Sequence, residues 1–134
     1  MGMQLEGGLI NGSMKRKTAI NKHLPKLITL LNLQDWEIEI TYETENCNED
    51  PTVGMDNTIS IPYLRSAIRC YPIMEDHTDA YIRDVLCHEL CHIITEPMYS
   101  MCNANVNPHL QPFVEEMREQ ETERISRVAL KGYK

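Results

Sequence analysis

The residues best suited to chemistry are two histidines and a glutamate in one short segment, His88-Glu89-Leu90-Cys91-His92. In a helix, a spacing of four places His88 and His92 on the same face, one turn apart, where both can reach a single metal ion. Glu89 lies beside them and can contact a metal-bound water without ligating the metal. Zinc lowers the pKa of such a water to about 7, so that a neighbouring carboxylate can take its proton as the water attacks a carbonyl. The segment therefore predicts a metal site with Glu89 as general base, which later passes the proton to the leaving amine.

The same five residues are a rare combination in a chain of this composition. With five histidines and fourteen glutamates in 134 residues, chance would produce roughly 0.02 matches to the pattern H-E-x-x-H. The alternative interpretation is a pair of surface histidines one turn apart on an amphipathic helix. We favour the metal site because the match falls inside a segment that is itself predicted to be helical.

Two histidines do not complete a catalytic zinc site, which needs a third protein ligand and an open position for water. Metzincins have that ligand in the longer pattern H-E-x-x-H-x-x-G-x-x-H. Here Thr95 and Met98 occupy the positions of the glycine and the third histidine. That class of metallopeptidase is therefore excluded, and the third ligand comes from elsewhere in the chain.

The candidates for the third ligand are His109 and three glutamates of the last predicted helix, Glu119, Glu121 and Glu123. We favour Glu119, because Glu123 follows it at i+4 on the same side of the helix and could hydrogen-bond a ligating histidine. Glu121 is the main rival, since it lies nearer the centre of the apolar stripe on a helical wheel. Most other acidic residues of this helix are expected to face solvent.

The hydrophobic pattern places these residues on helices that follow a small sheet. Apolar residues recur at helical spacing from Lys15 to Leu31, and apolar and polar residues alternate from Trp36 to Glu43, which predicts a helix and then a strand. Met55-Asp56-Asn57 is expected to be a turn. Further strands are predicted at 58–64 and 66–71, then a motif helix that ends before Pro97 and a last helix marked by Phe113, Val114, Met117, Ile125 and Val128. This order predicts an α+β domain with a three-stranded mixed sheet.

Length and composition limit the class of protein further. A chain of 134 residues forms one domain; we assign residues 14–134 to it and expect residues 1–13 to be an expression leader or disordered. The net charge of −7 disfavours binding to nucleic acid or to an anionic membrane surface, and no run of 18 apolar residues could span a bilayer. Five cysteines without framework spacing, and no signal peptide, predict reduced thiols in the cytoplasm. The sequence does not indicate an oligomeric state.

The chain resembles the zincin metallopeptidases, and within them the gluzincin branch, in the segments His88-Glu89-x-x-His92 and Glu119-x-x-x-Glu123. It is similar to the small single-domain members known as minigluzincins and to short phage- and prophage-type proteins, over about residues 32–129. This resemblance implies zinc-dependent hydrolysis of a peptide or protein substrate, with zinc held by the two histidines and Glu119.

The resemblance has further implications for the surroundings of the site. It implies that substrate adds as an extended strand to an edge strand of the sheet, a place that the segment 66–71 would take. The family also uses a tyrosine or histidine that stabilises the developing oxyanion; Tyr99 and His109 are candidates, and the alternative for Tyr99 is packing at a helix interface. Small relatives can be latent, so residues 131–134 are a candidate for a self-blocking tail.

Four further residues of metal-binding types are expected to lie outside the metal site. Cys87 and Cys91 are expected to be small buried residues, because Cys87 is rotated by about 100° from His88 on the helix and cannot easily share its metal. His23 and His77 are expected to be exposed to solvent.

The leading interpretation is a soluble zinc metallopeptidase. One alternative is a regulatory peptidase of phage or mobile-element origin that cleaves one specific partner, and another is a non-catalytic zinc-binding interaction module. Glu89 argues against the interaction module, because a purely structural zinc site has no use for an acid at that position. A DNA-directed zincin protease would favour a basic patch, whereas this chain is acidic.

Overall fold

The computed structural model describes residues 7–133. Within this range three α-helices and a three-stranded mixed sheet form the predicted α+β domain. In chain order the elements are α1 (Gly7–Leu30), β1 (Glu37–Tyr42), β2 (Met55–Ser60), β3 (Arg65–Cys70), α2 (Asp79–Asn105) and α3 (Gln111–Lys131), with short 3-10 helices at Pro72–Asp76 and Pro108–Leu110. Of the segment 1–13, predicted as a leader, residues 1–6 lie outside the described residues and 7–13 have helical backbone continuous with α1. In the described range no helix has the length and apolar character needed to cross a membrane.

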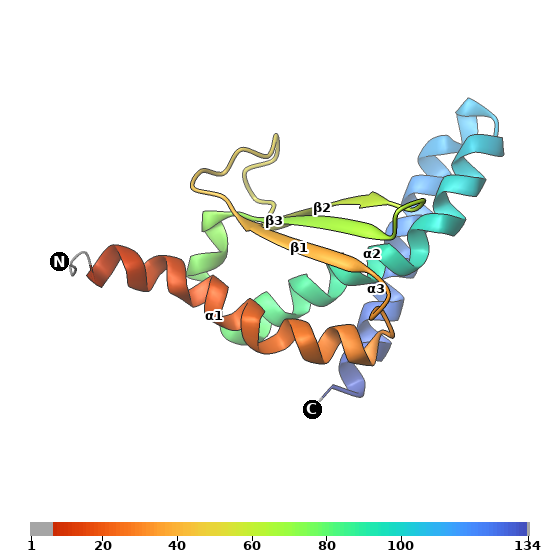
Figure 1. Cartoon of the computed structure of the whole chain (residues 1–134). Helices are drawn as coiled ribbons and strands as arrows, with labels where there is room; N and C mark the ends of the chain where they lie inside the picture. Colours follow the sequence, from red (N-terminus) through yellow and green to blue (C-terminus); the bar gives the residue numbers. More distant parts are fainter. Residues whose placement is uncertain (1–6, 134) are drawn as a thin grey trace.

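Helices α1 and α2 lie on one side of the sheet, and α3 packs along α2 (Figure 1). The apolar stripe predicted for α1 faces the core, where Ile20 and Leu27 are completely buried. The helix ends as predicted, and Asn32 then takes the left-handed conformation with φ of 58°, which helix termini favour. Exposed and half-buried residues alternate along β1, so the sheet presents its polar side chains on the other face.

Strand β3 lies in the centre of the sheet, in the order β1-β3-β2. It runs parallel to β1, with Glu37 opposite Arg65, and antiparallel to β2, with Met55 opposite Cys70. The expectation that the segment 66–71 forms an edge strand is therefore wrong. β2 and β3 are joined by a short connection and form a hairpin. β1 pairs with the other edge of β3, which places β3 between the two outer strands, β1 and β2. Alternate side chains of the central strand β3 are buried.

Strand β2 begins three residues earlier than predicted and ends at Ser60. The expected turn at Met55-Asp56-Asn57 is wrong, because each polar side chain has a cross-strand partner. Asp56 accepts hydrogen bonds from Nε and Nη2 of Arg69 on β3 at 2.9 and 2.8 Å, while Met55 enters the core. Polar residues that are satisfied in this way do not interrupt a strand.

Helix α2 is longer than predicted, since it continues through Pro97 to Asn105. A proline inside a helix lacks an N–H donor and costs about 3 kcal/mol, which is why an end was expected there. The packing of α3 along α2 offsets this cost. The resulting α2–α3 hairpin projects beyond the sheet (Figure 1).

The buried side of α3 also differs from the prediction. Phe113, Met117 and Val128, expected to mark the buried stripe, are 67%, 56% and 63% exposed. The residues that α3 buries are Thr122 and Ser126. Small hydroxyl side chains let the two helices approach closely, and Thr122 finds hydrogen-bond partners on both of them.

Candidate metal centre

Helix α2 carries the two motif histidines and is fixed in the core by its apolar face. Its first turn is capped by Thr78, whose hydroxyl accepts the backbone N–H of Tyr81 at 3.1 Å. Leu86 and Leu90 on the opposite face are completely buried. This anchoring sets the rotation of the helix, so that the histidine side faces α3.

His88, His92 and Glu119 form a group in which the potential ligand atoms all lie within 4.8 Å of one another. Oε1 of Glu119 is 3.4 Å from Nε2 of His88, and Oε2 is 3.5 Å from Nε2 of His92. Two ligands bound tetrahedrally at about 2.1 Å from one zinc ion would lie about 3.4 Å apart. The spacing of these groups therefore fits a metal ion, and two nitrogens with one carboxylate are a donor set that suits zinc.

Hydrogen bonds hold both imidazoles with Nε2 toward Glu119. Nδ1 of His88 lies 3.0 Å from Oε1 of Glu123, and Nδ1 of His92 lies 3.4 Å from the hydroxyl of Thr122. The Thr122 hydroxyl donates to the carbonyl of Arg118 at 2.7 Å, so it accepts from His92. His92 then has its proton on Nδ1 and a lone pair on Nε2, which is the form that ligates metal, and Glu123 faces the corresponding Nδ1 of His88.

No pattern in the sequence pointed to Thr122 as part of the site. Its position three residues after Glu119 puts it on the adjoining face of α3, and it is completely buried. A buried hydroxyl is satisfied only by a fixed partner. The only sequence signal for this role was a threonine three residues after the predicted ligand Glu119.

Glu89 lies next to the ligand group, and β2 fixes its backbone. The Asn57 side-chain amide donates to the Glu89 carbonyl at 2.9 Å, and Ser66 of β3 donates to the Asn57 side-chain oxygen at 2.7 Å. Burial, together with the negative charges of Glu119 and Asp56, raises the pKa of the Glu89 carboxyl to about 8. A cation bound next to it would lower this pKa again.

Burial also acts on His92 and lowers its pKa to about 4. The imidazole is therefore neutral near pH 7. A neutral ring is what a metal site requires, since the ion displaces any proton from the ligating nitrogen.

Arg118 is the positive charge nearest to the ligand group. Its Nη2 is 3.5 Å from Oε2 of Glu119, and Nη1 is 3.4 Å from Oε1 of Glu96. Nη2 also contacts the Glu115 carboxylate. Tyr99, predicted as a possible oxyanion stabiliser, lies with its ring 4.3 Å from the guanidinium, and its hydroxyl donates to Glu115. The structure thus places Tyr99 at the α2–α3 interface, and Arg118 beside Glu119.

The other candidates for the third ligand lie outside the group of three. Glu121 forms an ion pair with Arg124 at 3.4 Å. His109 is an exposed residue of the connection between α2 and α3. Cys87 and Cys91 are buried, as expected for small core residues.

His23 is buried, which contradicts the expectation that it is exposed. Its Nε2 lies 2.8 Å from Oδ2 of Asp79 at the start of α2, and its Nδ1 contacts the hydroxyl of Tyr133. Asp79 and Tyr133 are distant from His23 in sequence and contact its imidazole in the fold. No local sequence pattern could therefore predict that His23 is buried. His77 is half-buried and stacks on Tyr81.

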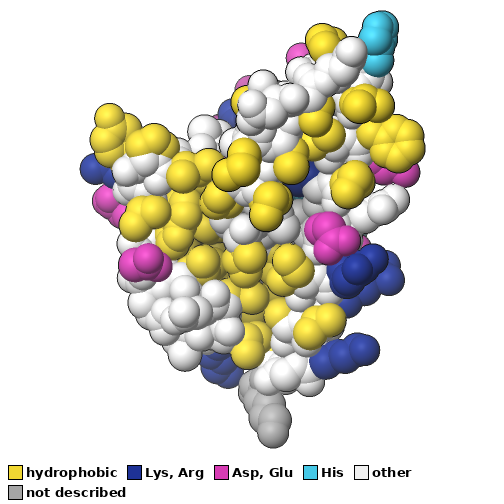
Figure 2. All heavy atoms as spheres, turned by 90° about the vertical axis from the view of Figure 1, so that its right-hand side faces the viewer, with side chains coloured by type: hydrophobic (Ala, Val, Ile, Leu, Met, Phe, Trp, Pro, Cys, Tyr) yellow, Lys and Arg dark blue, Asp and Glu magenta, His cyan; other side chains and the backbone are white. Residues whose placement is uncertain are grey.

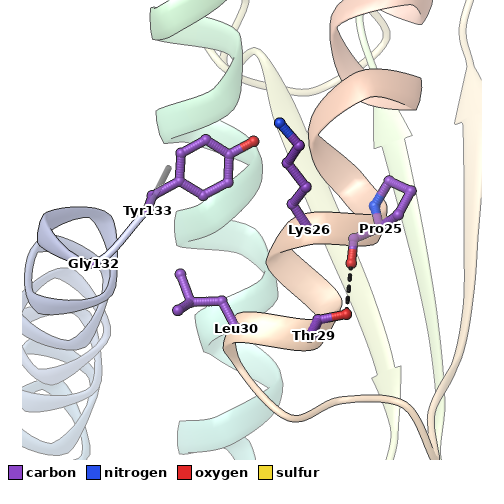
Figure 3. A pocket seen from close by; sticks show the side chains of 6 residues that line it. All are labelled: Pro25, Lys26, Thr29, Leu30, Gly132 and Tyr133. Carbon is purple, nitrogen blue, oxygen red and sulfur yellow. Dashed lines mark hydrogen bonds between the residues drawn. The ribbon is translucent and has the colours of Figure 1, made fainter.

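The end of α3 lies against α1 rather than in the metal centre. Gly132 and Tyr133 border a hollow of about 580 Å³, with α1 forming its other wall (Figure 3). Within the described residues, the tail that was a candidate for self-blocking therefore takes no part in the ligand group. Lys134, its last member, lies outside the described residues.

Comparison of the chain with protein-family models, curated proteins and solved structures gave no match. The function is therefore inferred from the site itself. The site comprises the three converging ligand groups, the half-buried carboxyl of Glu89 beside them and an outer strand that is hydrogen-bonded to the same turn of α2.

Proposed function

We propose that this protein is a zinc-dependent metallopeptidase of gluzincin type, with zinc held by His88, His92 and Glu119. The observation that carries the proposal is the spacing of 3.4 and 3.5 Å between the Glu119 oxygens and the two Nε2 atoms. With His92 protonated on Nδ1, its Nε2 and the Glu119 oxygens are acceptor atoms that converge. Such atoms repel one another, and a bound cation removes that repulsion.

Zinc in this position would activate a water molecule and polarise the substrate carbonyl. Glu89 then takes the proton of the water and later delivers it to the leaving amine. The hydrogen bond from Asn57 keeps the backbone of Glu89 at a constant distance from β2. An extended peptide that pairs with the outer edge of β2 would therefore be aligned with the general base.

A structural zinc site is the competing interpretation. Structural sites are usually closed by four protein ligands, whereas three converge here and an acid adjoins them. Glu119 is about half exposed, which leaves a side of the group open to water. These features favour catalysis over a purely structural role.

The experiment compares casein hydrolysis by the zinc-loaded wild type, Glu89→Gln and Glu121→Gln. We expect Glu89→Gln to lose at least about 100-fold in rate while it retains zinc, since general-base catalysis contributes 10²–10⁴-fold. Glu121→Gln should retain both activity and zinc. A wild type that binds zinc and hydrolyses no faster than Glu89→Gln would contradict the peptidase.

A further inference from the structure

Arg118 of α3 lies between the two helices that carry the ligand group, one residue before Glu119. Its side chain is 23% exposed, and the guanidinium lies 4.3 Å from the centre of the Tyr99 ring of α2. Nη1 is 3.4 Å from Oε1 of Glu96 on α2, and Nη2 contacts the carboxylate of Glu115 on α3. An aromatic ring and two carboxylates, contributed by both helices, therefore fix the position of the guanidinium.

Arg118 also borders a groove of about 290 Å³ that is lined mainly by apolar side chains and includes none of the three ligand groups. Figure 2 shows hydrophobic side chains gathered over this end of the molecule. The ion pairs of Arg118 are made instead with the carboxylates that lie next to the metal centre, those of Glu96, Glu115 and Glu119.

The guanidinium reaches the third ligand candidate directly. Nη2 of Arg118 lies 3.5 Å from Oε2 of Glu119, and this oxygen is also 3.5 Å from Nε2 of His92. The Glu119 side chain is about half exposed, so solvent is the alternative environment for its carboxylate. Arg118 thus acts on the same oxygen that Glu119 directs toward His92.

Repulsion between neighbouring carboxylates would otherwise favour an outward position of Glu119. Glu115 and Glu119 are four residues apart on α3, and like charges at this spacing repel each other. Arg118 makes an ion pair with both. Its positive charge replaces this repulsion by two attractions, so the Glu119 carboxylate can stay on the side of α3 that faces the histidines of α2.

We propose that Arg118 is a positioning residue that holds the Glu119 carboxylate in the ligand group. The inference rests on the proposed function, because it concerns the ligand that Glu119 would provide. Groups that fix a metal ligand from behind contribute about 10- to 100-fold to metal affinity. In this arrangement Tyr99 supports the guanidinium, which is a different role from stabilising an oxyanion.

An opposing effect has to be weighed, since a positive charge next to a metal site repels the cation. The guanidinium of Arg118 is surrounded by three carboxylates, those of Glu96, Glu115 and Glu119. They compensate its charge at the metal position, whereas nothing else in the described residues makes an ion pair with Oε2 of Glu119 apart from His92. We therefore expect positioning to outweigh repulsion.

The test measures the zinc affinity of the full chain by competition with a chromophoric chelator. We expect Arg118→Gln to bind zinc about 10- to 100-fold more weakly than the wild type. Arg118→Lys keeps the positive charge but not the planar fork that contacts several carboxylates at once, so it should recover part of this affinity. Arg124→Gln is the matched control: Arg124 lies on the same helix, pairs with Glu121 and is 72% exposed, and the variant should bind zinc like the wild type.

A double-mutant cycle separates positioning from a general effect on the fold. In a Glu119→Gln background there is no carboxylate to position, so the addition of Arg118→Gln should cause no further loss of zinc affinity. Thermal unfolding in the presence of a chelator establishes that each variant is folded. Arg118→Lys, the milder change, takes the place of Arg118→Gln in the cycle if the latter does not fold.

Unchanged or tighter zinc binding by the folded Arg118 variant would overturn the proposal, and so would an equal loss of affinity in the wild-type and Glu119→Gln backgrounds. Either result leaves the proposed peptidase intact when the wild type binds zinc and hydrolyses casein. A wild type that binds zinc without hydrolysing casein contradicts the peptidase alone, and the affinities of the variants still decide the role of Arg118. A wild type that does not bind zinc overturns both.

Discussion

Glu119 is the residue on which the ligand group depends, because it alone comes from α3 and faces both histidines. Its two oxygens lie at nearly equal distances from the two Nε2 atoms. An amide at this position keeps the size of the side chain but supplies one neutral oxygen and one N–H donor, which opposes a cation.

Replacement of Glu119 by glutamine should therefore weaken zinc binding at least about 100-fold, as expected when an anionic ligand of a three-residue site is lost. Glu121→Gln, two residues further along α3, should bind zinc like the wild type. Competition with a chromophoric chelator measures both affinities. Equal affinities for Glu119→Gln and the wild type would show that Glu119 is not a ligand.

The raised pKa of Glu89 predicts a pH-dependent stability in the absence of metal. The folded protein keeps this carboxyl protonated up to a pKa of about 8, whereas its ordinary value is 4.5. Between these values the folded state binds more protons than the unfolded state, so the free energy of unfolding falls as the pH rises.

Glu89→Gln removes this loss. Its stability relative to the wild type should increase from about pH 4.5 to about pH 8, by at most about 1.4 kcal/mol per pH unit. Urea denaturation in the presence of a chelator measures it. His92, whose pKa is lowered, is common to both proteins and cancels in the difference. Parallel stability curves for the two proteins would contradict the prediction.

At the scale of elements, helix α2 continues through Pro97 although this residue has no N–H to donate to the Ile93 carbonyl. Pro97 is exposed, so its ring is not needed to fill the core. Pro97→Ala should raise the free energy of unfolding by about 1–3 kcal/mol, because it restores a donor to the Ile93 carbonyl and removes the steric conflict with it. Chemical denaturation checks this. A less stable variant would show that the proline is required for the packing of the hairpin.

The elements that sequence predicts well are those whose signal is local. Apolar spacing located the end of α1 and the strands β1 and β3 closely, although α1 begins at Gly7 rather than near Lys15, and the H-E-x-x-H spacing placed two histidines on one helical face. The failures have partners distant in sequence. Asp56 is satisfied by Arg69, α2 packs along α3 on both sides of Pro97, and His23 is covered by Asp79 and Tyr133. None of these contacts produces a hydrophobic periodicity or a motif spacing that can be recognised in the sequence.

For the molecule as a whole, the ligand group joins α3 to the rest of the fold. A zinc ion bound between α2 and α3 stabilises only the state in which both are docked. At a free zinc concentration 100 times the dissociation constant, this linkage contributes about 2.7 kcal/mol and raises the melting temperature by about 10 °C.

Removal of zinc by a chelator should therefore lower the melting temperature by about 10 °C. His92→Ala should abolish the shift, and His109→Ala should retain it, since His109 lies outside the ligand group. Differential scanning calorimetry provides the measurement. A melting temperature that is independent of zinc in the wild type would exclude a site that bridges the two helices.

The hydrogen bond from Asn57 to the Glu89 carbonyl has a mechanical consequence. Because β2 is an outer strand, a chain that pairs with its free edge would lie next to the strand whose Asn57 amide holds the motif turn of α2. The sheet edge and the Glu89 carboxyl are thus linked through a single hydrogen bond. A chain that stiffens β2 by lying along it would also steady the turn from which Glu89 projects.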